Sequence, residues 1–208
     1  MSFQLCYITD RKALGPGALL PRIVAAVRAG VDLVQIREKD LSTRELIDIV
    51  GPAVEMMRGS STRLVVNDRL DVALGHGAAG VHLGDQSLPA PIVREVVPPS
   101  FLVGVSCHLL EEALASAAAR ADYILLGPIF ETPSKLAYGP PLGLAKLREV
   151  AAKVSVPILA LGGITVDRTP ACLEAGAAGI AGISIFQTCA SIERRMAELR
   201  TAMLAASH

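Results

Sequence analysis

Two basic side chains, Arg37 and Lys39, directly follow the short apolar run Leu33–Ile36. On an extended segment, residues that are two apart project to the same side, so these cations could grip one polyanion through charge-assisted hydrogen bonds. Lys135, which follows a loop of small and hydroxyl residues, is a third cation of this kind. The alternative interpretation treats residues 37–40 as an ordinary solvated charge run.

Two carboxylates, Asp68 and Asp85, come after neighbouring apolar runs. Such a pair could hold one Mg²⁺, which usually takes one or two carboxylates and completes its shell with water and substrate phosphates. Asp68 is the stronger of the two candidates. Its competing role is to cap the helix that follows it, because Asn67-Asp68 also matches the chemistry of a helix start.

Glycines follow the last two apolar runs, in Gly162-Gly163 and in Gly182-Ile183-Ser184. Bare backbone N–H groups at such points allow a close approach to a phosphate, although a glycine pair also suits a plain tight turn. His108 could exchange protons, but a lone histidine is more often a packed or hydrogen-bonding residue. We expect His82 and Cys107 to be core residues.

The elements that must position these residues are eight short apolar runs that alternate with helical patterns, which predicts a (β/α)₈ TIM barrel of the α/β class and one domain over residues 1–208. The expected strands are Leu5–Thr9, Leu33–Ile36, Leu64–Val66, Gly80–Leu83, Phe101–Val105, Tyr123–Leu126, Ile158–Leu161 and Ile180–Ile183. Helices are expected over Thr43–Arg58, where Ser42 and Glu45 have capping-box spacing, and over Glu111–Ala119. In such a barrel the chemistry lies at the carboxyl ends of the strands, where most of the polar residues named above fall.

The composition agrees with this fold and narrows the function classes. The 208 residues are 51% hydrophobic but only 3% aromatic, as expected for buried parallel strands packed with Ala, Val, Ile and Leu. Twenty basic residues balance twenty acidic ones without a long basic block, which argues against nucleic acid and anionic membranes as partners and for a small molecule. Four scattered cysteines and the absence of a signal-like N-terminus predict a cytoplasmic protein.

Several motifs occur in one order over nearly the whole chain: Tyr7-Ile8-Thr9-Asp10, Gln35-Ile36-Arg37-Glu38-Lys39, Val66-Asn67-Asp68-Arg69, Gly80-Val81-His82-Leu83-Gly84, Gly104-Val105-Ser106, Gly127-Pro128-Ile129-Phe130 with Thr132 to Lys135, and Gly162-Gly163-Ile164. This ordered set resembles the superfamily of thiamine-phosphate synthases and thiazole tautomerases. The resemblance implies a transferase that joins hydroxymethylpyrimidine diphosphate to a thiazole phosphate with Mg²⁺ and releases pyrophosphate. The resemblance does not determine the oligomeric state, and a homo-oligomer is possible.

The resemblance also implies roles for individual residues. The diphosphate would be bound by Arg37, Lys39, Asn67 and Lys135, with Ser106 beside the leaving group. Gln35 would contact the pyrimidine, and Asp68 would bind Mg²⁺. The thiazole phosphate would be held by Thr132, Gly163 and Ser184.

One departure from the family pattern concerns the loop Gly84-Asp85-Gln86-Ser87. Synthases usually carry a second metal-binding Asp where this chain has Ser87. Either Asp85 substitutes for it, the outcome that the sequence favours, or metal binding is weakened. Weak metal binding would favour a thiazole tautomerase, with His108 moving protons, or a non-catalytic phosphate-binding barrel. The synthase is favoured because the chain keeps most of a diphosphate site, which a tautomerase does not need: Gln35, Arg37, Lys39, Asn67, Asp68 and Lys135.

Overall fold

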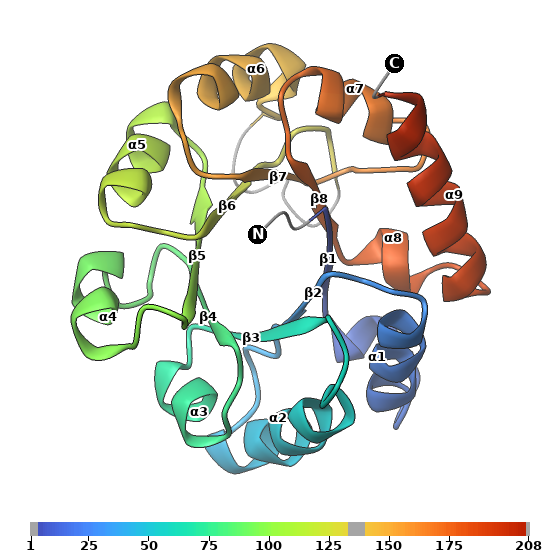
Figure 1. Cartoon of the computed structure of the whole chain (residues 1–208). Coiled ribbons are helices and arrows are strands. Elements are labelled where there is room, and N and C mark those ends of the chain that lie inside the picture. The colour runs from blue at the N-terminus through green and yellow to red at the C-terminus, as the bar shows by residue number, and fades with distance from the viewer. Residues whose placement is uncertain (1–3, 133–139, 207–208) are drawn as a thin grey trace.

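The computed structural model describes residues 4–132 and 140–206. Eight parallel strands form a closed barrel in which each strand pairs with the next along the chain and β8 pairs with β1. Helices form a ring outside the strands (Figure 1). This confirms the predicted (β/α)₈ architecture.

The strands are short, as expected for a small barrel. Their bounds are β1 Leu5–Ile8, β2 Leu33–Ile36, β3 Arg63–Asn67, β4 Gly80–Leu83, β5 Leu102–Cys107, β6 Tyr123–Leu126, β7 Ile158–Leu161 and β8 Gly179–Gly182. Four of them, β2, β4, β6 and β7, agree with the sequence prediction residue for residue. The other four differ by one or two residues at their ends.

The helices cover the outside of the barrel. They are α1 Leu19–Arg28, α2 Thr43–Met56, α3 Leu70–Gly75, α4 Ala90–Val96, α5 Leu110–Ala118, α6 Gly143–Lys153, α7 Thr169–Glu174, α8 Ser184–Gln187 and α9 Ile192–Ala205, with a 3₁₀ turn η1 over Arg11–Ala13. The predicted capping box is confirmed, because Ser42 and Glu45 exchange hydrogen bonds at the start of α2. No helix in the described ranges is long and apolar enough to span a membrane.

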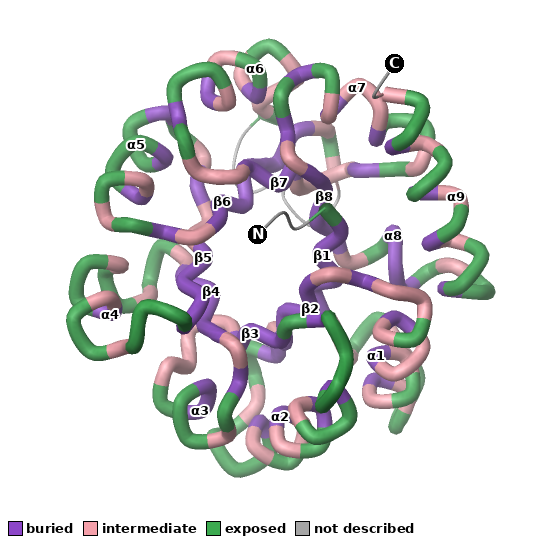
Figure 2. The backbone as a smooth tube through the Cα atoms, in the orientation of Figure 1, coloured by how far each residue is buried: buried purple, intermediate pink, exposed green. Residues whose placement is uncertain are grey.

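Apolar side chains fill two separate spaces. One cluster lies inside the barrel and includes Cys6, Leu33, Val65, Tyr123 and Leu159. A larger cluster fills the layer between strands and helices. The strands are therefore buried on both sides, while each helix buries one face (Figure 2). This packing fixes the strand ends that carry the polar residues.

The joints that lead from helices back to strands share one conformation. Gly30, Gly77 and Gly176 have positive φ there, and Arg120 adopts φ 59° at the corresponding joint before β6. Residues in this left-handed region end a helix and turn the chain sharply. These joints are thus the short turns of a repeated strand–helix unit.

Candidate active site

Asp68 is the centre of a polar cluster at the carboxyl ends of β3 and β4. Its backbone has φ 61°, and its N–H donates to the carbonyl of His82 at 2.8 Å. The carboxylate accepts hydrogen bonds from the side chains of Asn67 and Ser87. The following helix α3 has Arg69 at its N-cap and no side-chain cap. The capping role considered for Asp68 is therefore wrong.

A chain of amide groups connects the buried Gln35 to Asp68. The Nδ2 of Asn67 lies 2.6 Å from Oδ2 of Asp68, and the Nε2 of Gln35 donates to Oδ1 of Asn67 at 2.8 Å. The Asp68 carboxylate fixes the direction of both hydrogen bonds, because an ionised carboxylate accepts hydrogen bonds and cannot donate them. Consequently Gln35 is left with Oε1, a buried acceptor that has no hydrogen-bond partner among the described residues.

The predicted basic pair lies beside this cluster. The Nζ of Lys39 is 3.8 Å from Oδ2 of Asp68. The backbone N–H of Arg37 donates to Oγ1 of the buried Thr9 at 2.9 Å. The Arg37 guanidinium makes no hydrogen bond or ion pair with any residue that the structure describes. Arg37 is therefore a cation available to a ligand.

The acidic residues between and after these cations have other partners. Glu38 is buried and accepts hydrogen bonds from Oγ1 of Thr9 at 2.7 Å and from Arg11. Asp40 forms two hydrogen bonds with Arg11, at 2.6 and 2.9 Å, and these hold the pKa of its carboxyl well below the ordinary range. The alternative of a solvated charge run is thus wrong for Glu38. Among the described residues the Arg37 guanidinium therefore has no carboxylate partner, because Glu38 and Asp40 pair with Arg11 instead.

His82 and Ser106 meet at the edge of the same cluster. The Nε2 of His82 lies 2.9 Å from Oγ of Ser106, and its Nδ1 lies 3.1 Å from Oη of Tyr123. Burial lowers the pKa of His82 to about 3, so its imidazole is neutral at neutral pH. His82 is a buried residue, as predicted, but it connects the barrel interior to the site. Cys107 is also buried, and burial raises the pKa of its thiol to about 11.

The loop after β4 places Ser87, and not Asp85, against Asp68. The Ser87 hydroxyl accepts from the N–H of Gly84 at 2.7 Å and donates to the Asp68 carboxylate. Asp85 is exposed and lines a hollow of about 380 Å³ together with Ser106 and His108. The Nδ1 of His108 contacts the carbonyl of Gly127. Within the described ranges there is no group of three or more His, Cys, Asp or Glu residues that could hold a metal ion.

The ends of the last two strands carry the remaining predicted residues. Gly162 and Gly163 both have positive φ, and the carbonyl of Gly163 accepts from Nη1 of Arg168 at 2.7 Å. Ser184 is exposed at the first position of α8. Thr132 is half-buried at the end of the described segment after β6. Lys135 lies outside the described residues.

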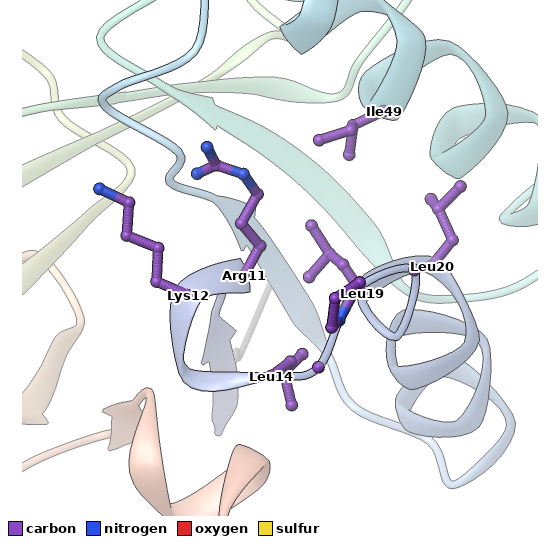
Figure 3. Close-up of a pocket in the computed structure, with 9 residues that line it drawn as sticks. Arg11, Lys12, Leu14, Leu19, Leu20 and Ile49 are labelled. Atoms are coloured by element: carbon purple, nitrogen blue, oxygen red, sulfur yellow. The ribbon is translucent and has the colours of Figure 1, made fainter.

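A second hollow, of about 420 Å³, lies beside the loop after β1 (Figure 3). Arg11 and Lys12 extend along one side of it, and the other side is formed by leucines of the loop and α1 with Ile49 of α2. Both cations are already paired with Asp40. This hollow shares no residue with the polar cluster around Asp68, so we assign no chemistry to it.

Three residues near the site were not expected from the sequence. Thr9 and Glu38 support the backbone of Arg37, and Tyr123 contacts His82. Each depends on the register between strands that are far apart in sequence. One signal was available for Tyr123, since Gly104 inside a strand marks a place where another group approaches closely.

The fold and the placement of these residues define a (β/α)₈-barrel enzyme with its site at the carboxyl ends of the strands. A family model described as thiamine monophosphate synthase matches residues 5–186. Hence the chain belongs to the thiamine monophosphate synthase family.

Individual relatives agree with this assignment. The thiamine-phosphate synthase of Roseiflexus castenholzii is 42% identical over 177 residues, which cover 85% of this chain and 78% of the relative. The thiamine-phosphate synthase of Methanoculleus marisnigri is 42% identical over 88% of this chain and 87% of the relative. The solved thiamine phosphate pyrophosphorylase from Pyrococcus furiosus superposes with a TM-score of 0.89 at 32% identity, covering 100% of this chain and 98% of that one.

Proposed function

We propose that this enzyme couples hydroxymethylpyrimidine diphosphate to a thiazole phosphate and releases pyrophosphate. The observation that carries the proposal is the polar cluster around Asp68. It combines Arg37, a Lys39 ammonium near the carboxylate, and a hydrogen-bonded amide chain. In the part of the chain that the structure describes, the Arg37 guanidinium has no partner and the amide chain ends in an acceptor without one. Cations suit a diphosphate, and the acceptor suits a ring that carries an amino group.

The diphosphate would lie over the ends of β2 and β3. There Arg37 and Lys39 supply charge, Asn67 belongs to the amide chain, and Ser106 supplies a hydroxyl from β5. We propose Lys135 as a further cation for the same group, on the basis of its motif. Concentrated positive charge lowers the energy of a leaving diphosphate.

The pyrimidine would be recognised by Gln35. Its Oε1 is buried and has no partner within residues 4–132 and 140–206, and its Nε2 donates to Asn67, so the amide presents an acceptor with a fixed orientation. An aromatic amino group is a donor that could satisfy it. The thiazole phosphate would lie at the ends of β7 and β8, where we propose Gly163, Ser184 and Thr132 as its contacts. Exposed backbone N–H groups at such strand ends hold phosphates in many barrels.

Mg²⁺ is the metal that we propose for this site. Asp68 offers a carboxylate whose side chain is 32% exposed, and the Ser87 hydroxyl lies against it. One carboxylate suits a Mg²⁺ that takes its other ligands from water and diphosphate oxygens. Bound there, the ion would neutralise charge on the departing diphosphate. Asp85, two positions before Ser87, is the second ligand that we propose to test.

The reaction would break the bond between the pyrimidine methylene carbon and the diphosphate oxygen, and the electron pair would leave with the diphosphate. The resulting pyrimidinylmethyl cation would be attacked by the thiazole nitrogen, which forms the new carbon–nitrogen bond. Arg37, Lys39 and Ser106 would stabilise the charge that develops on the leaving group, and the buried strand ends would limit access of water to the cation.

The proposal is tested by replacing the basic residues. Arg37→Ala and Lys135→Ala should each lower the coupling rate about 10- to 100-fold, since a charge-assisted contact contributes about 1.5–3 kcal/mol. Lys12→Ala is the matched control, because Lys12 is exposed and pairs with Asp40 at the other hollow. Coupling is measured with saturating Mg²⁺ and both substrates. Near-normal turnover in both variants would remove the diphosphate assignment.

We further propose that the enzyme works in the cytoplasm on small phosphorylated substrates. The balance of twenty basic and twenty acidic residues supports partners other than nucleic acid and membranes. A homo-oligomer is compatible with this proposal, and sedimentation of the purified protein tests it.

A further inference from the structure

Three side chains form a polar connection from the interior of the barrel to the site. Tyr123 of β6 and His82 of β4 are both buried, whereas Ser106 of β5 is half-buried and lines the hollow with Asp85 and His108. The phenol, the imidazole and the hydroxyl follow one another at 3.1 and 2.9 Å. The His82 imidazole in the middle has no direct access to solvent. Its hydrogen bonds with Tyr123 and Ser106 therefore determine which of its two nitrogens carries the proton.

The connection depends on a gap in β5. In the strand register Gly104 lies between His82 on one side and Tyr123 on the other. A β-carbon at position 104 would lie 2.1 Å from Cζ and 2.4 Å from Oη of Tyr123. Only a residue without a side chain therefore lets the phenol cross β5 to reach His82. The two rings stack at a centroid distance of 5.6 Å.

The direction of the two hydrogen bonds follows from the chemistry of the groups. A neutral imidazole donates from one nitrogen and accepts at the other. A phenol is a stronger donor than an aliphatic hydroxyl, because its pKa is near 10. An aliphatic oxygen is also a better acceptor than a phenolic oxygen, whose lone pair is delocalised into the ring. Both hydrogen-bond partners of His82 therefore favour the same arrangement. Tyr123 donates to Nδ1 of His82, and the Nε2–H of His82 donates to Ser106.

We propose that Tyr123 is a positioning residue that fixes the Nε2–H tautomer of His82, so that Ser106 accepts from His82 and directs its own proton into the active site. Ser106 then acts as a hydrogen-bond donor to an anionic oxygen. The opposite direction would make Ser106 donate to His82, which is the arrangement of a nucleophile and its base. The identity of the anionic oxygen, a diphosphate oxygen of the pyrimidine substrate, rests on the proposed function.

The tautomer is measured on the protein without substrate. Long-range ¹H–¹⁵N correlation spectra of protein labelled with ¹⁵N-histidine distinguish the two tautomers and the imidazolium, and His82→Gln assigns the signal. We expect the Nε2–H form of His82 throughout the range from pH 6 to pH 8. A signal of the Nδ1–H form or of the imidazolium would overturn the proposal. This result does not depend on whether the enzyme couples the proposed substrates.

Activity tests whether Tyr123 acts through Ser106. Tyr123→Phe should lower kcat about tenfold, the effect of one hydrogen bond, while the KM for the pyrimidine diphosphate changes less than about twofold. Tyr7→Phe is the matched control, since Tyr7 is a buried barrel tyrosine whose hydroxyl contacts neither His82 nor Ser106.

The double variant separates positioning from a general loss of packing. In a Ser106→Ala background, Tyr123→Phe should have no further effect on kcat, because the group that it positions is gone. A multiplicative loss in the double variant would overturn the proposal. Should Tyr123→Phe not fold, as judged by thermal unfolding, the tautomer of the wild-type His82 still decides the matter.

Discussion

Replacing Ser87 by Asp should make the stability of the fold depend on Mg²⁺. In the native structure the Ser87 hydroxyl accepts from Gly84 and donates to the Asp68 carboxylate. The variant Ser87→Asp loses this donor and brings a second carboxylate to the same place. Without a divalent cation, two negative charges would then lie within contact distance.

The size of the effect follows from this geometry. Two unit charges about 4 Å apart repel by about 4 kcal/mol at an effective dielectric constant of 20. The Asp68 side chain is 32% exposed, and the Nζ of Lys39 lies 3.8 Å from its Oδ2. Solvent and the ammonium therefore reduce the repulsion between the two carboxylates to about 1–2 kcal/mol. Loss of the serine hydrogen bond adds about 1 kcal/mol. The melting temperature should therefore fall by about 5–10 °C in the absence of Mg²⁺.

Thermal unfolding with EDTA and with increasing Mg²⁺ measures this prediction. Mg²⁺ between the two carboxylates should restore most of the lost stability, because a ligand that binds only the native state stabilises it by mass action. Gln86→Asp is the matched control, since it adds a carboxylate at an exposed position of the same loop. Equal melting temperatures of Ser87→Asp with and without Mg²⁺ would refute the reasoning. A Mg²⁺ titration of coupling by Asp85→Asn tests the proposed second ligand separately. A marked rise in the Mg²⁺ requirement would support Asp85 as a ligand, and an unchanged requirement would remove it from the site.

Three further predictions concern the buried groups that support the site. Gly104→Ala should destabilise the fold by at least about 2 kcal/mol in urea unfolding, because its β-carbon would lie 2.1 Å from Cζ of Tyr123; an unchanged midpoint would show that the ring can move aside. Glu38→Gln should reduce the free energy of unfolding by about 2 kcal/mol, because the buried carboxylate accepts hydrogen bonds from Arg11. An unchanged midpoint in the same urea unfolding experiment would contradict this prediction. His82 should make the fold sensitive to acid: burial lowers its pKa from 6.5 to about 3, so between these values the unfolded chain binds the additional proton. Stability should therefore fall as the pH decreases through this window, by up to about 1.4 kcal/mol per pH unit, and His82→Gln should lose that part of the slope.

The barrel could be predicted because its strands are buried on both sides. Parallel strands of this kind appear in the sequence as short continuous apolar runs, as in Leu33–Ile36 and Tyr123–Leu126. The ends of strands were less predictable. β5 continues to Cys107 because its backbone still pairs with β6 at Leu126, whereas the polar Ser106 suggested an earlier end. The polarity of a side chain therefore does not show whether the backbone at that residue still pairs with a neighbouring strand.

The site was predictable to the extent that it depends on position after a strand. Lys39 follows β2, Asn67 ends β3 and Asp68 comes directly after β3, and the closed barrel brings the three residues together. The connection from Tyr123 to His82 was not predictable beyond the signal of a glycine inside a strand, because it requires the register of three strands. The partner of Asp68 was also missed. Ser87 was counted as a lost ligand, yet the turn at Gly84 directs its hydroxyl onto the carboxylate.

The most direct test of the proposed function is the stoichiometry of coupling by the purified enzyme. Incubation with hydroxymethylpyrimidine diphosphate, thiazole phosphate and Mg²⁺ should yield thiamine phosphate and pyrophosphate in equal amounts, and EDTA should suppress both. Arg37→Ala should reduce both products together, because the Arg37 guanidinium has no partner among the described residues and is available to the diphosphate. Proton exchange on the thiazole without either product, abolished by His108→Ala, would contradict the proposed function and identify a tautomerase.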